Sequence, residues 1–378
     1  MNVKKKCFDY SKSNTRLLAF LTAHYKGQAE SALVKEIHKL QEIDTIQDVS
    51  SLIDFRRRAE TDQLSFSSRD INRTNFRLYG IGSALFGETR EKIYLTPSIE
   101  HGLILQDRNW SDTADTARAS CITFGPFRKA ILRRYYKTPV FEVGPYIQYA
   151  APYYDETRFQ EWKNQMGRTL LVFPSHGTDQ TGVTFDEALY VKKIESLAQS
   201  FDSVLVCAFW WNVSDRLIRM FSEAGYRIAC AGFREDPNFL RRLKTIIQVS
   251  DEMVCDSVGT HVGYGFSMGK RIRMLTADTR YTGELPLNIR FSEEQKNRIR
   301  RAVTEAGTRD ISDVFDYYWG NHIRLSEKER DDILEINKRI TLRGRYWTKN
   351  YAKEAGRLLS DYEKNDASKY RLLLKALK

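Results

Sequence analysis

The sequence predicts an α/β protein with two domains and a helical C-terminal segment. Between residues 168 and 277, short apolar runs alternate with stretches of helical periodicity, as in βαβ units around a parallel sheet. Residues before about 150 contain similar apolar runs, and residues after about 288 have a helical pattern. A chain of 378 residues is long enough for two domains, which we expect at 1–152 and 153–285, with the helical segment at 286–378.

The strands and helices of the second domain can be assigned in order. Its strands are expected in four apolar runs that each lead into a loop: TLLVFPSH, SVLVCAFWW, RIACAGF and EMVCDS. The helices between them are expected at 185–201, 214–224 and 239–250. Ser214 and Asp215 are suited to cap the second helix, and Gly225 to end it. The first helix is expected to bury one stripe of side chains: Phe185, Leu189, Ile194, Leu197 and Phe201.

The first domain has a less regular pattern. Its strands are expected in KIYLTPS, SCITFG and PVFEVGPYI, and a helix is expected in FRKAILRRYY. Residues 30–58 also have a helical pattern. The stretch PYIQYAAPYYDET, rich in Pro and Tyr, is expected to link the two domains.

The cysteines and the N-terminus indicate an intracellular protein. The five cysteines are scattered, without a C-x-x-C pair, so we expect neither disulfides nor a zinc site. The N-terminus is basic, but the apolar patch LLAFL after it is far shorter than the roughly 18 residues of a membrane span. We therefore expect a cytoplasmic protein.

The charge is concentrated at the C-terminal end. The formal net charge of the chain is +11, and residues 337–378 contain twelve Lys and Arg against four Asp and Glu, a net of +8. This segment also contains leucines, so two interpretations stay open: it packs its apolar face on the first domain, or it lies on an anionic membrane surface at the inner face of the membrane. A third interpretation, nucleic-acid binding by basic and aromatic side chains, ranks lower because no nucleic-acid motif accompanies them.

The stretch CDSVGTHVGYGFSMGKRIRML, residues 255–275, is the strongest candidate for a binding site. It follows a predicted strand at the position where ligands bind in parallel sheets, and a helix is expected to begin near Thr260. Free backbone N–H groups and the helix dipole favour phosphate at such a helix start. Gly259 permits close approach of an anion, and Ser257, Thr260 and His261 can donate hydrogen bonds to it. For each of these residues taken alone, a helix cap is the simpler interpretation.

Other loops are expected at the same edge of the sheet. Ser175 and His176 follow the first strand, 209–212 follow the second, and Arg234 follows the third. Of Trp210 and Trp211 in the second loop, at least one is expected to pack in the core rather than to stack on a base.

In the first domain, the loop after the first strand contains a carboxylate beside a histidine. Glu100 and His101 are candidates for a catalytic general base acting on an acceptor hydroxyl. The equally weighted alternative is a solvated glutamate beside a structural histidine.

Three segments resemble a known family. FPSHGTD, AGFREDPNFLRRLKTII and above all SVGTHVGYGFSMGKRIRML resemble the glycosyltransferases with two Rossmann-like domains facing a cleft (GT-B), which build bacterial capsule, O-antigen and other surface polysaccharides. The resemblance implies that a nucleotide-activated sugar is the donor and a polysaccharide or lipid-linked glycan the acceptor. It also implies transfer without metal or any further cofactor, consistent with a sequence that lacks Asp-x-Asp. Nucleic acid is not expected as a partner.

The resemblance also assigns roles to residues. It places Ser257, Thr260 and His261 on the donor phosphates with His176 and Arg234 nearby, and Glu100 or His101 at the acceptor. The histidine in the phosphate loop favours a donor activated by cytidine monophosphate and carrying an acidic sugar. A sugar-nucleotide 2-epimerase of the same fold is the alternative enzyme, although the paired acidic residues expected after its loop are missing here.

Overall fold

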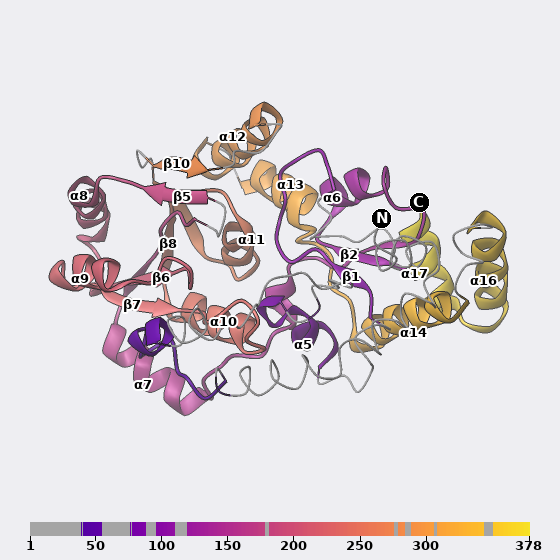
Figure 1. Ribbon diagram of the computed structural model, residues 1–378, viewed down its shortest axis with the longest axis horizontal. Helices are drawn as coiled ribbons and strands as arrows, with labels where there is room; N and C mark the ends of the chain where they lie inside the picture. Colours follow the sequence, from indigo (N-terminus) through magenta and orange to yellow (C-terminus); the bar gives the residue numbers. More distant parts are fainter. Residues whose placement is uncertain are drawn as a thin grey trace, which may run out of the picture. The chain divides into compact units, whose positions relative to one another are not determined.

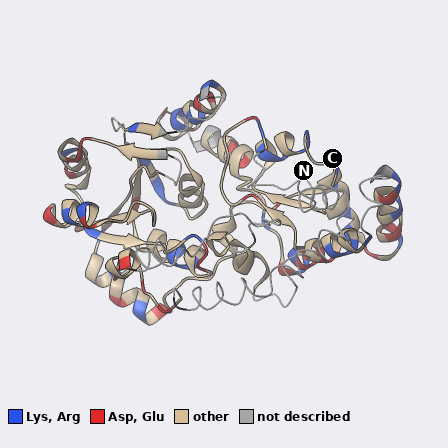
Figure 2. Cartoon of the chain, viewed as in Figure 1, with Lys and Arg blue, Asp and Glu red and all other residues tan. Residues whose placement is uncertain are grey.

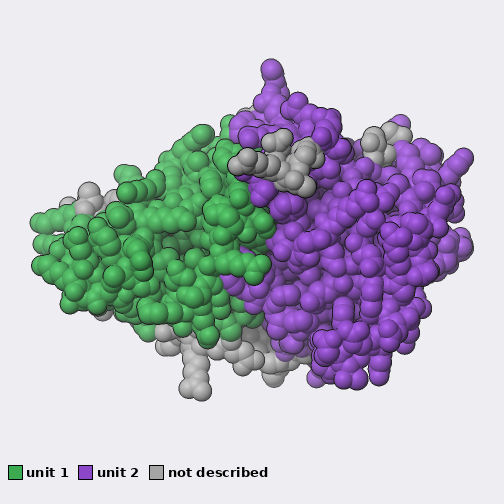
Figure 3. Space-filling model, turned by 180° about the vertical axis from the view of Figure 1, so that it is seen from behind, with its two compact units in different colours: residues 1–35, 66–145, 316–378 green, residues 36–65, 146–315 purple. Residues whose placement is uncertain are grey.

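The chain forms two compact units, each built from discontinuous segments (Figures 1 and 3). Unit 1 comprises 1–35, 66–145 and 316–378, and unit 2 comprises 36–65 and 146–315. A computed structural model describes the following residues of the chain: 39, 41–54, 76, 78–87, 96–109, 119–177, 181–275, 279–283, 289–305, 308–343 and 351–378.

Unit 2 contains a five-stranded parallel sheet. Its strands are β4 (Thr169–Phe173), β6 (Ser203–Ala208), β7 (Arg227–Cys230), β8 (Glu252–Cys255) and β9 (Arg271–Met274). They lie in the order β7-β6-β4-β8-β9, and all neighbours pair in parallel. The chain therefore builds outward from β4 in one direction, then returns and builds outward from β4 in the other. The reversal between β4 and β8 is the place where open α/β sheets form a ligand crevice, at the carboxyl ends of the strands.

The helices of unit 2 alternate with these strands as the sequence predicts. They are α7 (Glu156–Met166), α8 (Glu187–Ala198), α9 (Asp215–Glu223), α10 (Phe239–Val249), α11 (Thr260–Ser267) and α12 (Ile289–Glu305). Ser214 caps α9 by accepting a hydrogen bond from the Leu217 N–H, and Gly225 follows the helix with a φ of 78°, so both predicted boundaries are confirmed.

The predicted buried stripe of α8 is partly wrong. Leu189 is 38% exposed, whereas Tyr190 and Ile194 are buried against Val172 and Val206 of the sheet. The helix begins after Asp186, whose side chain accepts a hydrogen bond from the Leu189 N–H. Tyr190 and Ile194 share one face of the helix, and Leu189 lies about 100° around the axis from Tyr190, so it points away from that face.

A two-stranded antiparallel ribbon is an addition that the sequence pattern did not indicate. β5 (Thr181–Thr184) pairs with β10 (Arg280–Gly283), and Val183 lies opposite Tyr281. Both strands are short and rich in Gly and Thr, so they lack the apolar alternation from which strands are predicted.

Unit 1 contains a small parallel sheet of three strands. β1 (Ser98–Ile99), β2 (Cys121–Thr123) and β3 (Val140–Glu142) lie in that order. The helix α6 (Pro126–Leu132) connects β2 and β3, as predicted. The short helix α5 (Ile81–Phe86) follows a three-residue 3-10 helix, η1 (Leu78–Gly80). Of the helix predicted at 30–58, the structure describes residues 39 and 41–54, which belong to unit 2. Only 39, 41 and 50–54 are helical, and the turns at 42–49 show that the prediction of one continuous helix is wrong there; the other predicted residues lie outside the described ranges.

The C-terminal part of the chain is helical, as predicted. Its helices are α13 (Thr308–Trp319), α14 (Glu327–Arg343), α16 (Tyr351–Asn365) and α17 (Ala367–Leu377). α17 packs against β3 and α14, with Leu373 and Ala376 buried. Lys129 and Arg133 of unit 1 donate hydrogen bonds to the carbonyls of Lys375 and Leu377, both at 2.7 Å, and so hold the end of this helix.

Many basic side chains of these helices have acidic partners. Figure 2 shows Lys and Arg interleaved with Asp and Glu along α14 and α16. Arg343 and Arg357 both pair with Glu354, and Lys369 pairs with Asp332 and Glu335. The positive charge of this segment is therefore partly neutralised within unit 1.

The cysteines that the structure describes are buried. Cys121, Cys207, Cys230 and Cys255 are free thiols, and burial raises the pKa of each of them. Within the described ranges, no helix has both the length and the apolar character that crossing a bilayer requires.

Candidate functional site

The loops after β4 and β8 meet at the carboxyl edge of the sheet in unit 2. Ser175 follows β4, and its hydroxyl donates a 2.7 Å hydrogen bond to the carboxylate of Asp256, which follows β8. Because β4 and β8 are the strands between which the order reverses, this bond lies at the point where a ligand crevice is expected. The structure thus brings the predicted Ser175 into the same site as the 255–261 stretch.

The N-terminus of α11 lies in this site. Gly259 is its N-cap residue, no side chain in the described part of the chain caps it, and its first turn contains no acidic residue. Thr260 and His261 are the first two residues of this helix, whose N-cap residue provides no side-chain acceptor. A β-carbon on Gly259 would lie 3.0 Å from the His261 ring, so the glycine allows the ring to lie close against the helix start.

His261 occupies a dry position in the site. Its ring stacks on Phe173, with centroids 4.8 Å apart, and its Nε2 has no accessible surface and no hydrogen-bond partner among the described residues. Burial, with a smaller contribution from the nearby His176, lowers the pKa of His261 to about 3, against a hydrogen bond with the Ser257 backbone that raises it. His261 is therefore neutral at physiological pH, and its buried Nε2 is a polar atom without a hydrogen-bond partner among the described residues.

His176 forms the exposed part of the site. Its ring stacks on Phe209 at a centroid distance of 4.0 Å, and Nδ1 lies 3.1 Å from the carbonyl of Gly177. Loss of hydration around the ring lowers the pKa of His176, although the residue as a whole is exposed to solvent. The Gly177 N–H in turn donates to the side chain of Asn212, which ties this loop to the loop after β6.

Two tyrosines that the sequence analysis did not predict belong to the site. The Tyr281 hydroxyl, from β10, donates a 3.1 Å hydrogen bond to Ser175, and Tyr190 of α8 faces Asp256. Burial raises the pKa of Asp256 and of Tyr190. The two contacts join residues that are far apart in sequence, so no local pattern could have revealed them.

Arg234 has other contacts. It lies above the Trp210 ring at 5.9 Å and 3.7 Å from the carboxylate of Glu235. Trp210 is buried against Phe233, as the core interpretation predicts, whereas Trp211 is only half-buried. The role predicted for Arg234 on the donor phosphate stays a prediction.

The comparisons with known proteins add nothing to this geometry. Searches against family models, curated proteins and solved structures give no match. The described residues contain no group of three or more His, Cys, Asp or Glu side chains arranged to hold a metal ion.

Glu100 and His101 lie in a different environment, in unit 1. Both Glu100 and Arg128 are 0% exposed and form an ion pair at 2.6 Å, and Thr123 donates a second 2.6 Å hydrogen bond to Glu100. His101 is half-buried, and its ring lies 5.7 Å from that of Tyr79. In this arrangement a substrate cannot reach the Glu100 carboxylate. The alternative of a solvated glutamate is wrong too, because Glu100 is buried. His101 is the more exposed member of the pair.

Proposed function

We propose that the carboxyl edge of the sheet in unit 2 binds the phosphate of a nucleotide-activated sugar. On this proposal, the chain is a metal-independent glycosyltransferase that acts on a hydroxyl of a glycan or lipid-linked acceptor. The observation that carries the proposal is the uncapped start of α11, which lies beside the orphaned Nε2 of His261 where the strand order reverses. The sequence resemblance to two-domain glycosyltransferases supplies the reaction class.

A phosphate fits this site for electrostatic reasons. The N-terminus of a helix carries about half a positive charge, and its backbone N–H groups point at the ligand. His261 is neutral in the free protein, and an anion beside it would favour its protonated form, in which Nε2 donates a hydrogen bond. His176, at the exposed rim, can act in the same way.

The same groups would promote sugar transfer. When the bond from sugar to phosphate breaks, negative charge develops on the phosphate oxygens, and donors already in place stabilise it without reorganisation. The acceptor hydroxyl must lose a proton, and of the two residues predicted for this role we assign it to His101, since Glu100 is enclosed. The resemblance to this family of glycosyltransferases, in which a histidine in the phosphate loop accompanies such donors, implies a donor activated by cytidine monophosphate.

A thermal-shift screen tests the proposal. The wild-type protein, His261→Ala and the control His322→Ala are each heated with CMP, CDP, UDP, GDP or dTDP without metal. His322 is an exposed histidine of unit 1. A ligand that binds only the folded state raises the midpoint, by an amount that corresponds to about 2.7 kcal/mol at a hundred times the dissociation constant.

We expect one nucleotide to stabilise the wild type and His322→Ala but not His261→Ala, each compared with its own ligand-free midpoint. No shift with any nucleotide, or an equal shift in His261→Ala, would overturn the proposal.

A further inference from the structure

Tyr281 is a large aromatic residue that is anchored in the candidate site of unit 2 and yet exposed to solvent. It lies on β10, in the antiparallel ribbon that β10 forms with β5 (Figure 1). The residue is 45% exposed, although its hydroxyl is hydrogen-bonded to Ser175, which is only 4% exposed. One end of the side chain is therefore enclosed, and the exposed surface is that of the ring.

The hydroxyl of Tyr281 takes part in two hydrogen bonds with a fixed direction. Ser175 has a single hydroxyl proton, which it donates to the Asp256 carboxylate at 2.7 Å. The Ser175 oxygen can then only accept the 3.1 Å bond, so the Tyr281 hydroxyl must donate it. Burial raises the pKa of Tyr281, so the hydroxyl keeps the proton that this bond requires. The ring is thus held at one end by a bond that leaves its faces unused.

The surroundings of the ring carry little net charge. Val183 lies opposite Tyr281 in the ribbon, so the two side chains point to the same face. Arg300 and Glu293 of α12 both interact electrostatically with Tyr281, but they also pair with each other at 3.7 Å. This position therefore offers a ligand an aromatic surface rather than a charge.

The ring lies beside the loops that lead to the start of α11. Ser175 joins Tyr281 to Asp256, and Asp256 is followed by the short loop that ends at Gly259, the N-cap residue of α11. In a nucleotide, the ribose separates the phosphate from the base. A nucleotide whose phosphate lies at the start of α11 therefore has its base next to the helix start, where the structure places an exposed aromatic ring.

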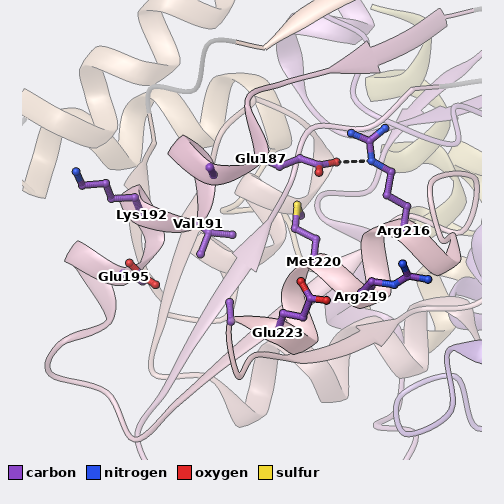
Figure 4. Close-up of a pocket in the computed structure, with 10 residues that line it drawn as sticks. Glu187, Val191, Lys192, Glu195, Arg216, Arg219, Met220 and Glu223 are labelled. Atoms are coloured by element: carbon purple, nitrogen blue, oxygen red, sulfur yellow. Dashed lines mark ion pairs between the residues drawn. The ribbon is translucent and has the colours of Figure 1, made fainter.

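The groove between α8 and α9 is the other concave surface in which a base could be sought (Figure 4). Its volume is about 860 Å³, and its described lining residues belong to α8, to α9 or to Ala224, which follows α9. Tyr190 of α8 faces Asp256, whereas its neighbour Val191 lines the groove. The groove thus lies on a different face of α8 from the candidate site, and a nucleotide bound at α11 does not extend into it.

We propose, on the basis of the proposed function, that Tyr281 is the platform on which the base of the bound nucleotide stacks. The phosphate of the same nucleotide lies at the start of α11. Because the Tyr281 hydroxyl is already bonded to Ser175, the ring is in place before the ligand binds and loses little conformational freedom on binding. Every base has a π-face, so this contact supplies affinity without choosing among bases.

Isothermal titration calorimetry with three ligands separates this contact from the phosphate site. CMP and UMP contain a base, whereas ribose 5-phosphate has the sugar and the phosphate without one. Tyr281→Leu removes the ring, and Tyr281→Phe keeps it. The control is Tyr135→Leu, which removes a tyrosine of unit 1 with nearly the same exposure, 44%. Thermal unfolding without ligand checks that each variant is folded.

We expect the wild type and Tyr135→Leu to bind CMP and UMP about tenfold more tightly than ribose 5-phosphate. Tyr281→Leu loses about tenfold in affinity for both nucleotides and keeps its affinity for ribose 5-phosphate. Tyr281→Phe binds the nucleotides more tightly than Tyr281→Leu, because the ring is still present.

Two results would overturn the platform and leave the phosphate site in place. One is a wild type that binds CMP and ribose 5-phosphate equally well, a comparison that needs no variant. The other is a Tyr281→Leu variant that keeps the wild-type affinity for CMP. A wild type that binds none of the three ligands would overturn the proposed function together with the platform.

Discussion

The carboxyl edges of the two parallel sheets differ in how their polar side chains are satisfied. In unit 1, the loop after β1 contains Glu100, whose carboxylate is enclosed by Arg128 and Thr123. In unit 2, the loops after β4 and β8 leave His176 exposed and Nε2 of His261 without a partner among the described residues. The same position after a strand therefore serves as a buried support in one sheet and as a candidate binding site in the other.

The edge in unit 1 is closed by the chain itself. Arg128 also donates hydrogen bonds to the carbonyls of Gln106, at 2.7 Å, and Arg108, at 3.3 Å, which fixes the loop after β1. The start of α6 is covered as well, because a β-carbon on Gly125 would lie 2.5 Å from the backbone N of Gly320. Polar residues beside a strand end thus indicate a ligand only where the fold leaves their hydrogen bonds unmade.

The largest expected effect follows from breaking the buried ion pair of unit 1. Glu100→Ala leaves Arg128 charged and enclosed, which costs about 3–5 kcal/mol of unfolding free energy. Asp361→Asn, which breaks the exposed pair with Arg339 in the same unit, costs about 0–1 kcal/mol. Urea denaturation followed by circular dichroism measures both. If Glu100→Ala kept the stability of the wild type, the contrast between the two edges would fail.

The fold was largely predictable from sequence, and the site only in part. Alternating apolar runs and helical periods locate the elements of unit 2 because each local pattern agrees with its place in the sheet. The burial of Glu100 depends on Arg128, 28 residues away, and the contact of Tyr281 with Ser175 spans 106 residues. Such contacts are set by how the elements pack, which a pattern along the chain does not contain.

A smaller effect is expected from the titration of His261. Its pKa is about 3 in the folded state and near 6.5 in the unfolded chain, so the unfolded state binds more protons as the pH falls through 6.5, and the folded state is destabilised. Between pH 7.5 and 5 the loss from His261 is about 2 kcal/mol. The lowered pKa of His176 adds to this loss, whereas the raised pKa of Asp256 acts in the opposite direction.

Asparagine at position 261 removes this titration. Denaturation of wild type and His261→Asn at the two pH values measures the difference. A wild type whose stability falls no more steeply than that of His261→Asn would show that the ring is not held neutral in a dry position.

The smallest effect is expected at the ribbon. Tyr281→Phe removes the hydrogen bond to Ser175 but leaves the bond from Ser175 to Asp256, so we expect a loss of about 1 kcal/mol or less. Ser175→Ala removes both bonds and leaves Asp256 less satisfied, so its loss is larger. Thermal unfolding of both variants ranks their stabilities. A larger loss in Tyr281→Phe than in Ser175→Ala would contradict the contact between Ser175 and Asp256 in this site.

The central claim is that the open edge of unit 2 binds a nucleotide phosphate, and histidine NMR tests it most directly. The chain contains six histidines, so their ring signals can be assigned by substitution and followed during titration with CMP and UDP. We predict that the nucleotide shifts the signals of His261 and His176 and raises the pKa of His261, while those of His322 and His101 stay in place. Ring signals of His261 and His176 that do not move at saturating nucleotide would contradict the claim.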